Sequence, residues 1–247
     1  MNEQTKGYIY ANQIALFGQP DIIGFGDSQF CVKEIERNIA NKIIIENHYS
    51  HKIYSATYIH LGVYINGELV GILQYGYAMN PASQGSLVKD TEIDEYLELN
   101  RMWLDDKAPR NSESKAISYS FKYIKRKFNG KIKWVQSFAD ERCKRFGVVY
   151  QACSFKYYGE HTQTFWELNG IVYHNIQMTV SKGTKRYTPE VEYLQTHKDQ
   201  ATKLTLRQFR YLFFIDKKYE KKCLLKELPY PKHKSLETEE GQNDANN

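Results

Sequence analysis

The chain has 247 residues, of which 41% are hydrophobic and 26% are charged, a composition typical of a soluble globular protein with one sizeable core. It contains no apolar run of roughly 18 residues, and its N-terminus lacks the basic and apolar regions of a secretory signal, so we expect neither a membrane span nor export. Four scattered cysteines without a CxxC pair argue against a disulfide framework or a zinc knuckle and favour a reducing cytoplasm.

Positive charge is concentrated towards the C-terminus. Residues 182–234 contain 14 Lys and Arg against 6 Asp and Glu, within a net charge of +5 for the whole chain. Aromatic side chains are interleaved with these cations, a pattern that can neutralise phosphates and lie against bases or sugars. The segment therefore favours contact with nucleic acid; a solvated, lysine-rich surface over a small aromatic core is the alternative.

The charge distribution also divides the chain. We predict a folded domain over residues 1–181 and a basic C-terminal extension, packed on that domain, over residues 182–234. Residues 235–247 hold four acidic residues and no basic one, and their polar composition predicts a disordered tail.

In chain order, residues 30–47 have apolar side chains at three- and four-residue intervals, which predicts an amphipathic helix. Residues 57–65 and 68–77 are rich in β-branched and aromatic side chains and are joined by an Asn-Gly pair, which predicts a hairpin. Residues 96–104 predict a further strand. The helix that follows begins near Ser112 and ends before Asn129-Gly130.

The second half of the chain continues the alternation. Residues 132–138 predict a short strand and residues 141–152 a helix. Residues 155–158, 164–168 and 171–180 predict strands, and we expect a helix near residues 205–212 in the basic extension. Strand–helix–strand–helix order implies parallel neighbours, and the hairpins add antiparallel ones. We therefore predict an α/β fold with a central mixed, partly parallel twisted sheet flanked by helices.

Two polar segments fall where elements end. His48 and His51 follow the first predicted helix, but an HxxH spacing alone is a weak metal signal. Asp140 follows the strand at residues 132–138, at the carboxyl end where ligands bind in open α/β sheets. A capping or surface role for the histidines and a helix N-cap role for Asp140 are the structural alternatives.

Arg101 and Ser114 are further candidates. Strand alternation places Arg101 on one face with Leu99 and Trp103, opposite Glu98. A guanidinium among apolar neighbours needs a partner, so an ion pair is the alternative to a functional role. Ser114 lies in the first turn of a predicted helix, where free N–H groups bind anions, although a capping box explains it equally well.

Several unusual strings carry a family resemblance across most of residues 45–225. They are NHYSHKIY (47–54), GILQYGYAMNP (71–81), ELNRMWLDDKAPRNSESKAIS (98–118), VQSFADERCKRFGVVYQACSFKYYGEH (135–161) and QFRYLFFIDKKYEKK (208–222). On these strings the chain resembles the Mom family of phage DNA-modification proteins, whose fold is similar to that of the GNAT acyltransferases. The resemblance implies a transferase that adds a carbamoylmethyl-type group to the exocyclic amine of adenine in DNA (methylcarbamoylation) and protects phage DNA from restriction.

The resemblance also implies a set of functional residues. Iron, as Fe²⁺, is expected on four ligands, His48, Tyr49, Asp140 and Tyr150, residue types that are chemically suitable for non-haem iron; His51 or His161 could substitute for a tyrosine. Arg101, Ser114, Asp140 and Tyr49 match positions expected to matter for catalysis. For DNA we expect contacts from Lys185, Arg186, Arg207 and Arg210, with Trp103, Tyr49 or Tyr157 stacking on an extruded base.

The group donor is left open by the sequence. A GNAT enzyme carries a glycine-rich pyrophosphate loop before the helix at Ser112, but this chain has no glycine between Asp105 and Asn129. Acetyl-CoA is therefore one candidate, and a different, glycine-derived small molecule fits the departure better.

Two rival functions also remain. One is a conventional acetyl-CoA-dependent N-acyltransferase acting on a protein or small amine, and the other is a non-catalytic, DNA-binding anti-restriction protein. The expected setting is the cytoplasm of a bacterial host, with double-stranded DNA as partner and the chain as a monomer or dimer.

Overall fold

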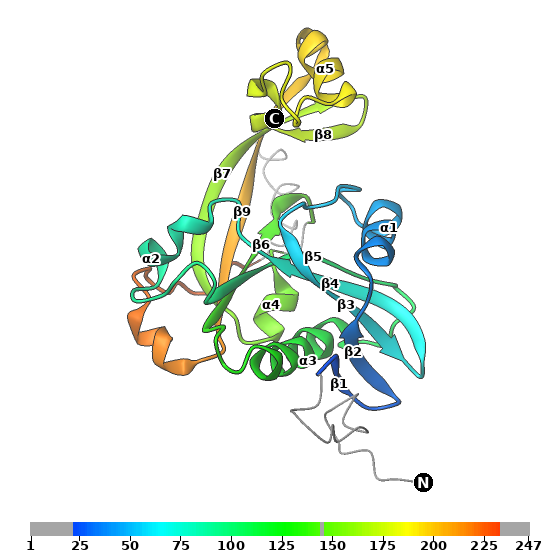
Figure 1. Cartoon of the computed structure of the whole chain (residues 1–247). Helices are drawn as coiled ribbons and strands as arrows, with labels where there is room; N and C mark the ends of the chain where they lie inside the picture. The colour runs from blue at the N-terminus through cyan, green and yellow to red at the C-terminus, as the bar shows by residue number, and fades with distance from the viewer. Residues whose placement is uncertain (1–21, 144–145, 233–247) are drawn as a thin grey trace, which may run out of the picture.

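The computed structural model describes residues 22–143 and 146–232. Within them, nine strands form one sheet in the order β1-β2-β3-β4-β5-β6-β9-β7-β8. The strands are β1 (Gly24–Gly26), β2 (Phe30–Glu34), β3 (Thr57–Ile65), β4 (Glu68–Gly76), β5 (Tyr96–Leu104), β6 (Trp134–Asp140), β7 (Lys156–Leu168), β8 (Ile171–His174) and β9 (Thr202–Phe214). The α-helices are α1 (Arg37–Asn47), α2 (Gln84–Leu87), α3 (Ser112–Lys127), α4 (Val148–Ala152) and α5 (Pro189–Thr196). Figure 1 shows their arrangement.

One parallel pair interrupts an otherwise antiparallel sheet. β5 and β6 pair in parallel through Tyr96–Glu98 and Trp134–Gln136, and α3 makes the crossover between them. Every other strand pair is antiparallel. The predicted mixed, partly parallel α/β sheet is therefore confirmed.

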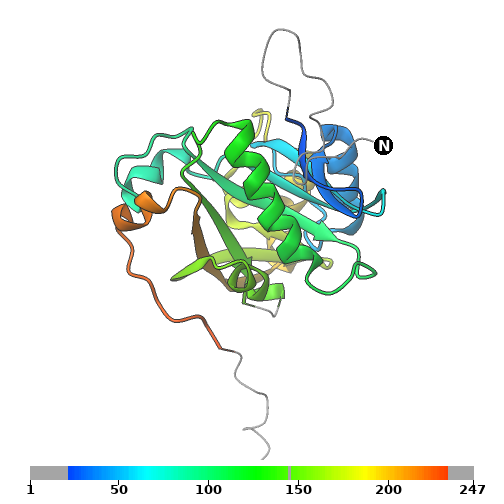
Figure 2. The ribbon, with the colours of Figure 1, turned by 90° about the horizontal axis from the view of Figure 1, so that it is seen from below.

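The two faces of the sheet are covered differently. α3 and α4 lie on one face, seen from below in Figure 2, over a large apolar cluster that includes Val135, Phe155 and Tyr211. On the other face, α1 packs its Ala40 and Ile44 over part of the sheet only. A second cluster, made of Ala78, Leu87, Val88, Tyr96, Trp134, Leu212 and Phe214, covers the end of that face beside α2.

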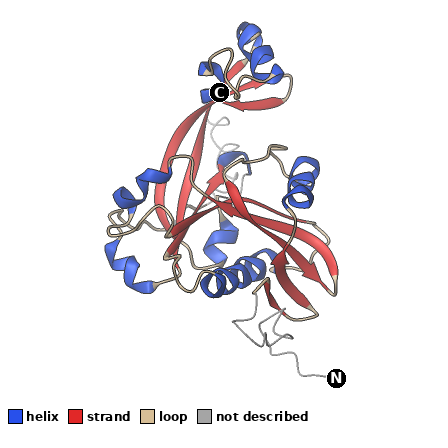
Figure 3. Ribbon diagram, in the orientation of Figure 1, coloured by secondary structure: helices blue, strands red, loops and turns tan. Residues whose placement is uncertain are grey.

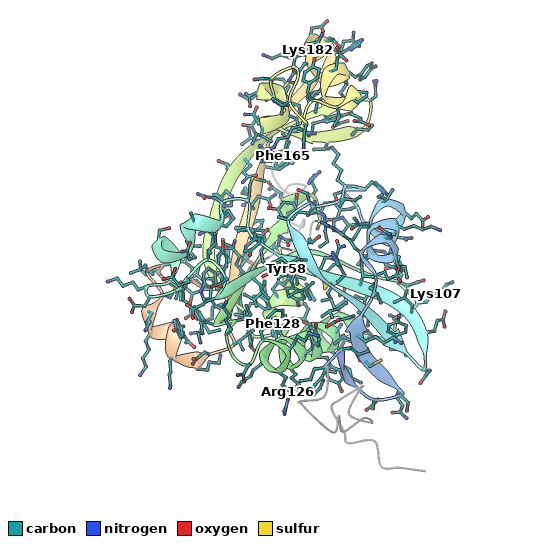
Figure 4. All side chains as sticks on the ribbon, in the orientation of Figure 1. Tyr58, Lys107, Arg126, Phe128, Phe165 and Lys182 are labelled. Atoms are coloured by element: carbon teal, nitrogen blue, oxygen red, sulfur yellow. The ribbon has the colours of Figure 1, made fainter. Side chains whose placement is uncertain are left out.

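β7 and β9 are thirteen residues each and extend beyond the rest of the sheet as a two-stranded ribbon (Figure 3). At its end lies the distal lobe, residues 169–201, which contains β8, α5 and a 3₁₀ turn at Asn175–Thr179. Leu168, Tyr173 and Leu194 form a separate small core there. Phe165 and Lys182, labelled in Figure 4, mark the base and the far end of the lobe.

The elements with strong local signals agree with the sequence predictions. The hairpin has its turn at Asn66-Gly67, with φ of 50° and 87°, as an Asn-Gly turn requires. β5 has the predicted bounds, and α3 begins at Ser112 as predicted. None of the described helices is long and apolar enough to cross a membrane.

Two predicted helices are partly wrong. Residues 30–34 form β2, because Phe30 and Val32 alternate into the core against β3, and the helix starts only at Arg37. The predicted helix at residues 141–152 is a 3₁₀ turn at Glu141–Cys143 and the short α4. Gly147, at φ 80°, precedes α4 and has no room for a Cβ beside the Tyr211 ring.

The C-terminal half differs more. β7 is one strand with an irregularity between Tyr157 and Glu160, and β8 ends at His174. The helix predicted near residues 205–212 is wrong, because these residues belong to β9, which pairs with β6 on one side and β7 on the other. The basic extension thus contributes an interior strand, while the division of the chain at residue 181 stays a prediction. The predicted disordered tail lies outside the described residues.

Candidate active site on the open face of the sheet

Polar side chains are concentrated on the part of the sheet that none of the described helices covers. On the face opposite α3, paired residues form rows across neighbouring strands. Glu98 of β5 lies beside Gln136 of β6, and Phe138 of β6 lies beside Arg210 of β9. Asp140 of β6 lies beside Gln208 of β9, which also pairs with His161 of β7. Because residues paired across neighbouring strands share a face, these seven side chains lie together. We call this region, between α1, the distal lobe and the apolar cluster at α2, the open face.

His48 lies directly after α1 and is only 6% exposed. Its Nδ1 accepts a hydrogen bond from the Ser50 backbone N–H at 3.1 Å and lies 2.8 Å from the Ser50 Oγ. Burial, reinforced by the positive charge of Arg101, lowers the pKa of His48 to about 3. The imidazole is therefore neutral near pH 7, with its proton on Nε2.

Asp140, Arg142 and Tyr49 form a contact chain beside His48. Arg142 donates from Nε and Nη2 to both carboxylate oxygens of Asp140, at 3.0, 3.1 and 2.5 Å. The same guanidinium lies 5.3 Å from the Tyr49 ring centroid, and the Tyr49 and His48 rings are 4.3 Å apart. The loop after α1 and the end of β6 therefore meet, while the catalytic roles of these residues stay predictions.

The charges of this cluster follow from its burial. Burial raises the pKa of Asp140, but the hydrogen bonds and charge of Arg142 outweigh it, so the pKa is lowered overall. Tyr49 is 51% exposed, yet its hydroxyl end is desolvated beside Cys143 and Asp140, which raises the pKa of the phenol. Asp140 is thus ionised and Tyr49 protonated at neutral pH.

Arg101 is held near this cluster by main-chain carbonyls rather than by an ion pair. Its Nε donates to the Lys52 carbonyl at 3.1 Å and its Nη1 to the Asn100 carbonyl at 2.7 Å. The predicted strand alternation is wrong here: a register shift leaves Asn100 without a partner on β4, so Leu99 faces α3 while Arg101 shares a face with Glu98. β-Bulges re-aim side chains in this way.

The same loop is tied to the distal lobe. Lys52 Nζ donates to the Val172 carbonyl at 2.8 Å and lies 4.2 Å from the Tyr173 ring centroid. Arg142 lies 5.2 Å from the ring centroid of Phe165, at the base of the lobe (Figure 4). The lobe is therefore in contact with the loop that carries His48 and Tyr49.

Tyr150 does not lie with the other predicted iron ligands. It packs against the Phe155 and Tyr211 rings and its hydroxyl bonds to the side chain of Ser137. Side chains alternate along β6, so Ser137 and Asp140, three residues apart, point to opposite faces of the sheet. Tyr150 is thus on the α3 and α4 side of the sheet.

Ser114 is also on the α3 and α4 side. It is half-buried, and its Oγ donates to the Asn111 carbonyl at 3.0 Å. It lines a cavity of about 760 Å³ where α3 begins and α4 ends, together with Arg110, Lys115, Cys153 and other, mainly polar, residues.

The predicted DNA contacts are spread over three places. Lys185 and Arg186 line a cavity of about 470 Å³ in the distal lobe. Arg210 lies on the open face, whereas Arg207 faces the other side of β9 and pairs with Glu141 at 2.8 Å. Of the predicted stacking residues, Tyr157 is buried against Phe209 and Tyr211, and Trp103 packs with the α1 cluster; Tyr49 alone of the three is half-exposed.

The remaining histidines are placed differently from each other. His51 is exposed and its Nδ1 lies 2.8 Å from the Ile45 carbonyl. His161 is on the open face, edge-on to Phe138 at 5.4 Å. Arg142 was not predicted from the sequence as a site residue. Its position two residues after Asp140, in the turn that follows β6, was a usable signal, because such a turn lets the Arg142 side chain fold back onto the Asp140 carboxylate.

Comparison with known proteins gives two kinds of similarity. The sequence profile of the Mom protein family matches residues 29–232. The methylcarbamoylase Mom of Escherichia phage Mu is 42% identical over 236 residues, which are 94% of this chain and 96% of that protein. Among solved structures, the ribosomal-protein-S5-alanine acetyltransferase of Vibrio fischeri has a TM-score of 0.46 at 11% identity, covering 78% of this chain and 97% of that one. The spermidine/spermine N-acetyltransferase SpeG of Vibrio cholerae gives the same four values.

Proposed function

The chain belongs to the Mom protein family, and from this we infer that it is a transferase that methylcarbamoylates the exocyclic amine of adenine in DNA. The observation that carries this proposal is the 42% identity to the phage Mu methylcarbamoylase along almost the whole of both chains. The carbamoylmethyl group expected from the sequence is an isomer of the methylcarbamoyl group named for that relative. We propose that the methylcarbamoyl group is the one transferred.

The open face supplies the side chains for this reaction. The amine of adenine is a weak nucleophile because its lone pair is delocalised into the ring, so the enzyme must hold it rigidly and remove its proton. Adenine inside a duplex is also out of reach, so the base must leave the stack. Half-exposed Tyr49, held between His48 and Arg142, offers an aromatic surface for an extruded base.

Arg142 acts as a positioning residue in this proposal. It fixes the Asp140 carboxylate through both oxygens and contacts the Tyr49 ring. Since one guanidinium holds both side chains, a shift of the β6 end would move the aromatic surface with it.

The donor has to reach the face of the sheet on which the adenine lies, because the reacting atoms must be in contact. The polar cavity of about 760 Å³ at the start of α3, lined by Arg110, Lys115, Ser112 and Ser114, lies on the other face and does not serve as the donor site in this proposal. The turn before α3 lacks the glycines that cradle a coenzyme A pyrophosphate. We therefore propose a donor other than acetyl-CoA.

The predicted iron site does not fit the described geometry. Tyr150 lies on the other face of the sheet, both oxygens of Asp140 accept from Arg142, and Nδ1 of His48 accepts from the Ser50 backbone. In the described part of the chain, no three His, Cys, Asp or Glu side chains are grouped to hold an ion. Iron stays an expectation of the resemblance, no step here is routed through it, and elemental analysis of the purified protein tests it.

DNA is proposed to bind across the distal lobe and the open face. Lys185 and Arg186 in the lobe would contact the backbone, since cation–phosphate contacts supply most sequence-independent affinity. We also propose that the modification protects DNA from restriction and that the enzyme acts in the cytoplasm of a bacterial host.

The test is to express the protein in bacteria, digest the DNA to nucleosides and analyse deoxyadenosine by mass spectrometry. We expect a modified nucleoside that fragments as a methylcarbamoyl rather than a carbamoylmethyl derivative, because the intact masses of these isomers are equal. The product should disappear in Asp140→Ala and His48→Ala and persist in Asp199→Ala, an exposed control in the lobe. Unmodified adenine from soluble wild-type protein would leave the two rival functions.

A further inference from the structure

Two opposite charges face each other on the open face without pairing. Glu98 on β5 and Arg210 on β9 flank β6, with Glu98 level with Gln136 and Arg210 level with Phe138, so two strand spacings and a two-residue offset, together roughly 12 Å, separate their backbones. Each influences the pKa of the other, yet no ion pair joins them. Within residues 22–143 and 146–232, Arg210 has no hydrogen bond or acidic partner, and its guanidinium lies 5.3 Å from the Phe138 ring centroid.

Glu98 is held in place by amides. Asn100 Nδ2 donates to its Oε1 at 2.9 Å and Gln136 Nε2 donates to its Oε2 at 2.7 Å. Both amides leave their own buried oxygens without a partner in the described structure. An unsatisfied buried acceptor is destabilising, so the carboxylate is oriented at a cost in stability. Each Glu98 oxygen can still accept another hydrogen bond.

Burial disfavours the charged forms of Glu98 and Arg210, and a ligand that forms hydrogen bonds with both would offset this desolvation. Desolvation raises the pKa of Glu98, and desolvation lowers the pKa of Arg210. A half-buried guanidinium that contacts only a ring has five donors available. A purely structural role for Glu98, in which it joins β5 to β6 through Gln136, would not explain why Arg210 is held half-buried without an acidic partner in the described structure. The unpaired cation points to a ligand between them.

The chemistry of the missing ligand is that of a nucleobase. Adenine presents its exocyclic amine, a donor, beside a ring nitrogen that accepts, on both its Watson–Crick and its major-groove edges. A carboxylate matches the amine and a guanidinium matches the ring nitrogen. Phe138 on β6 is level with Arg210 and diagonal to Glu98, which is level with Gln136, and its ring offers a flat floor with the His161 ring against its edge. Other bases also have a donor beside an acceptor, so the choice of adenine rests on the proposed function.

We propose that Glu98, Phe138 and Arg210 form the seat of the extruded adenine, with the Glu98 carboxylate accepting from the exocyclic amine and Arg210 donating to the adjacent ring nitrogen. Glu98 is then the catalytic base. As the amine nitrogen bonds to the carbonyl carbon of a methylcarbamoyl donor, the donor's leaving group departs with its bonding electron pair. The amine's surplus proton passes to a Glu98 oxygen, which becomes a carboxylic acid.

The closing experiment uses the full chain and two readouts. The first is modified deoxyadenosine in the DNA of expressing cells, which supply the donor. The second is binding, by fluorescence anisotropy, of two labelled single-stranded oligonucleotides, one of adenines and one in which each adenine is replaced by unsubstituted purine, which lacks the amine. Glu98→Gln removes the charge with little change of shape, and Glu95→Gln, three residues earlier and paired with Lys133, is the matched control.

We expect wild-type protein and Glu95→Gln to bind the adenine strand more tightly than the purine strand. Glu98→Gln should lose that preference and reduce the modified fraction about 100-fold or more, the range for loss of a general base. Arg210→Met, which keeps Glu98 and serves if Glu98→Gln misfolds, should weaken both strands about 10-fold, because both retain the ring nitrogens. Wild-type preference and modification in Glu98→Gln would overturn the seat. If wild-type protein prefers the adenine strand but produces no modified deoxyadenosine, the proposed function would be overturned instead.

Discussion

The two faces of β6 and β9 have opposite characters although they belong to the same strands. Towards α3 and α4, Val135, Ala139, Phe209 and Tyr211 are buried in the large apolar cluster. On the open face, the alternate residues Phe138, Asp140 and Arg210 lie among charges and are partly exposed or ion-paired. Residues that stabilise the fold therefore alternate along one strand with residues that face the candidate site, so neighbouring substitutions should have separable effects.

The largest effect should come from the covered face. Phe209 is 1% exposed and contacts the Tyr157 ring, so Phe209→Ala should lower the free energy of unfolding by about 3–5 kcal/mol. Phe138→Ala, on the half-exposed open face, should cost far less stability while abolishing modification. Chemical denaturation of both variants measures the difference; equal destabilisation would contradict the division between faces.

Next comes the ion pair at the end of β6. Arg142→Ala leaves the buried Asp140 carboxylate without its partner, which should cost about 1–3 kcal/mol. The double variant Arg142→Ala/Asp140→Asn should regain much of that stability without regaining activity, because no charge is then buried. Thermal unfolding and nucleoside analysis report the two properties; a double variant that modifies DNA would remove Arg142 and Asp140 from the site.

The pH dependence of stability should identify His48. Its pKa is about 3 in the folded state and about 6.5 when unfolded, so the unfolded chain binds the proton first. The contribution of the neutral imidazole is therefore fully present above pH 6.5 and is lost as pH falls towards 3, with a slope of at most about 1.4 kcal/mol per pH unit. In His48→Gln, this slope should be absent between pH 6.5 and 4; an unchanged slope would assign it to other groups.

The smallest effect concerns the distal lobe, where charge serves binding alone. Lys185→Glu with Arg186→Glu should weaken duplex DNA binding about 10-fold or more and reduce the dependence of affinity on salt, because two phosphate contacts are removed. Lys107→Glu, an exposed charge at the side of the main body and away from the lobe in Figure 4, should change neither. Titrations at several salt concentrations decide; equal losses in both variants would make the lobe an ordinary charged surface.

Local signals were sufficient for part of the fold. The Asn66-Gly67 turn, the bounds of β5 and the start of α3 at Ser112 depend on residues close in sequence, and each was predicted at the observed position. The helix predicted near residues 205–212 was wrong, because β9 is paired on both sides and its sequence pattern reflects two strands that are distant in the chain. The exchange of faces at Asn100 is likewise invisible without the partner strand.

The site shows the same division. The family, the residue types of His48, Tyr49 and Asp140, and their positions at element ends follow from the amino-acid sequence. The folded chain was needed to see that Arg142 joins Asp140 to Tyr49. It was also needed to see that Tyr150 lies across the sheet, and that Glu98 faces an unpaired Arg210. The reason is physical: chemical type belongs to a residue, but its partner is set by which strands pair and in which register, and that depends on contacts far apart in the chain.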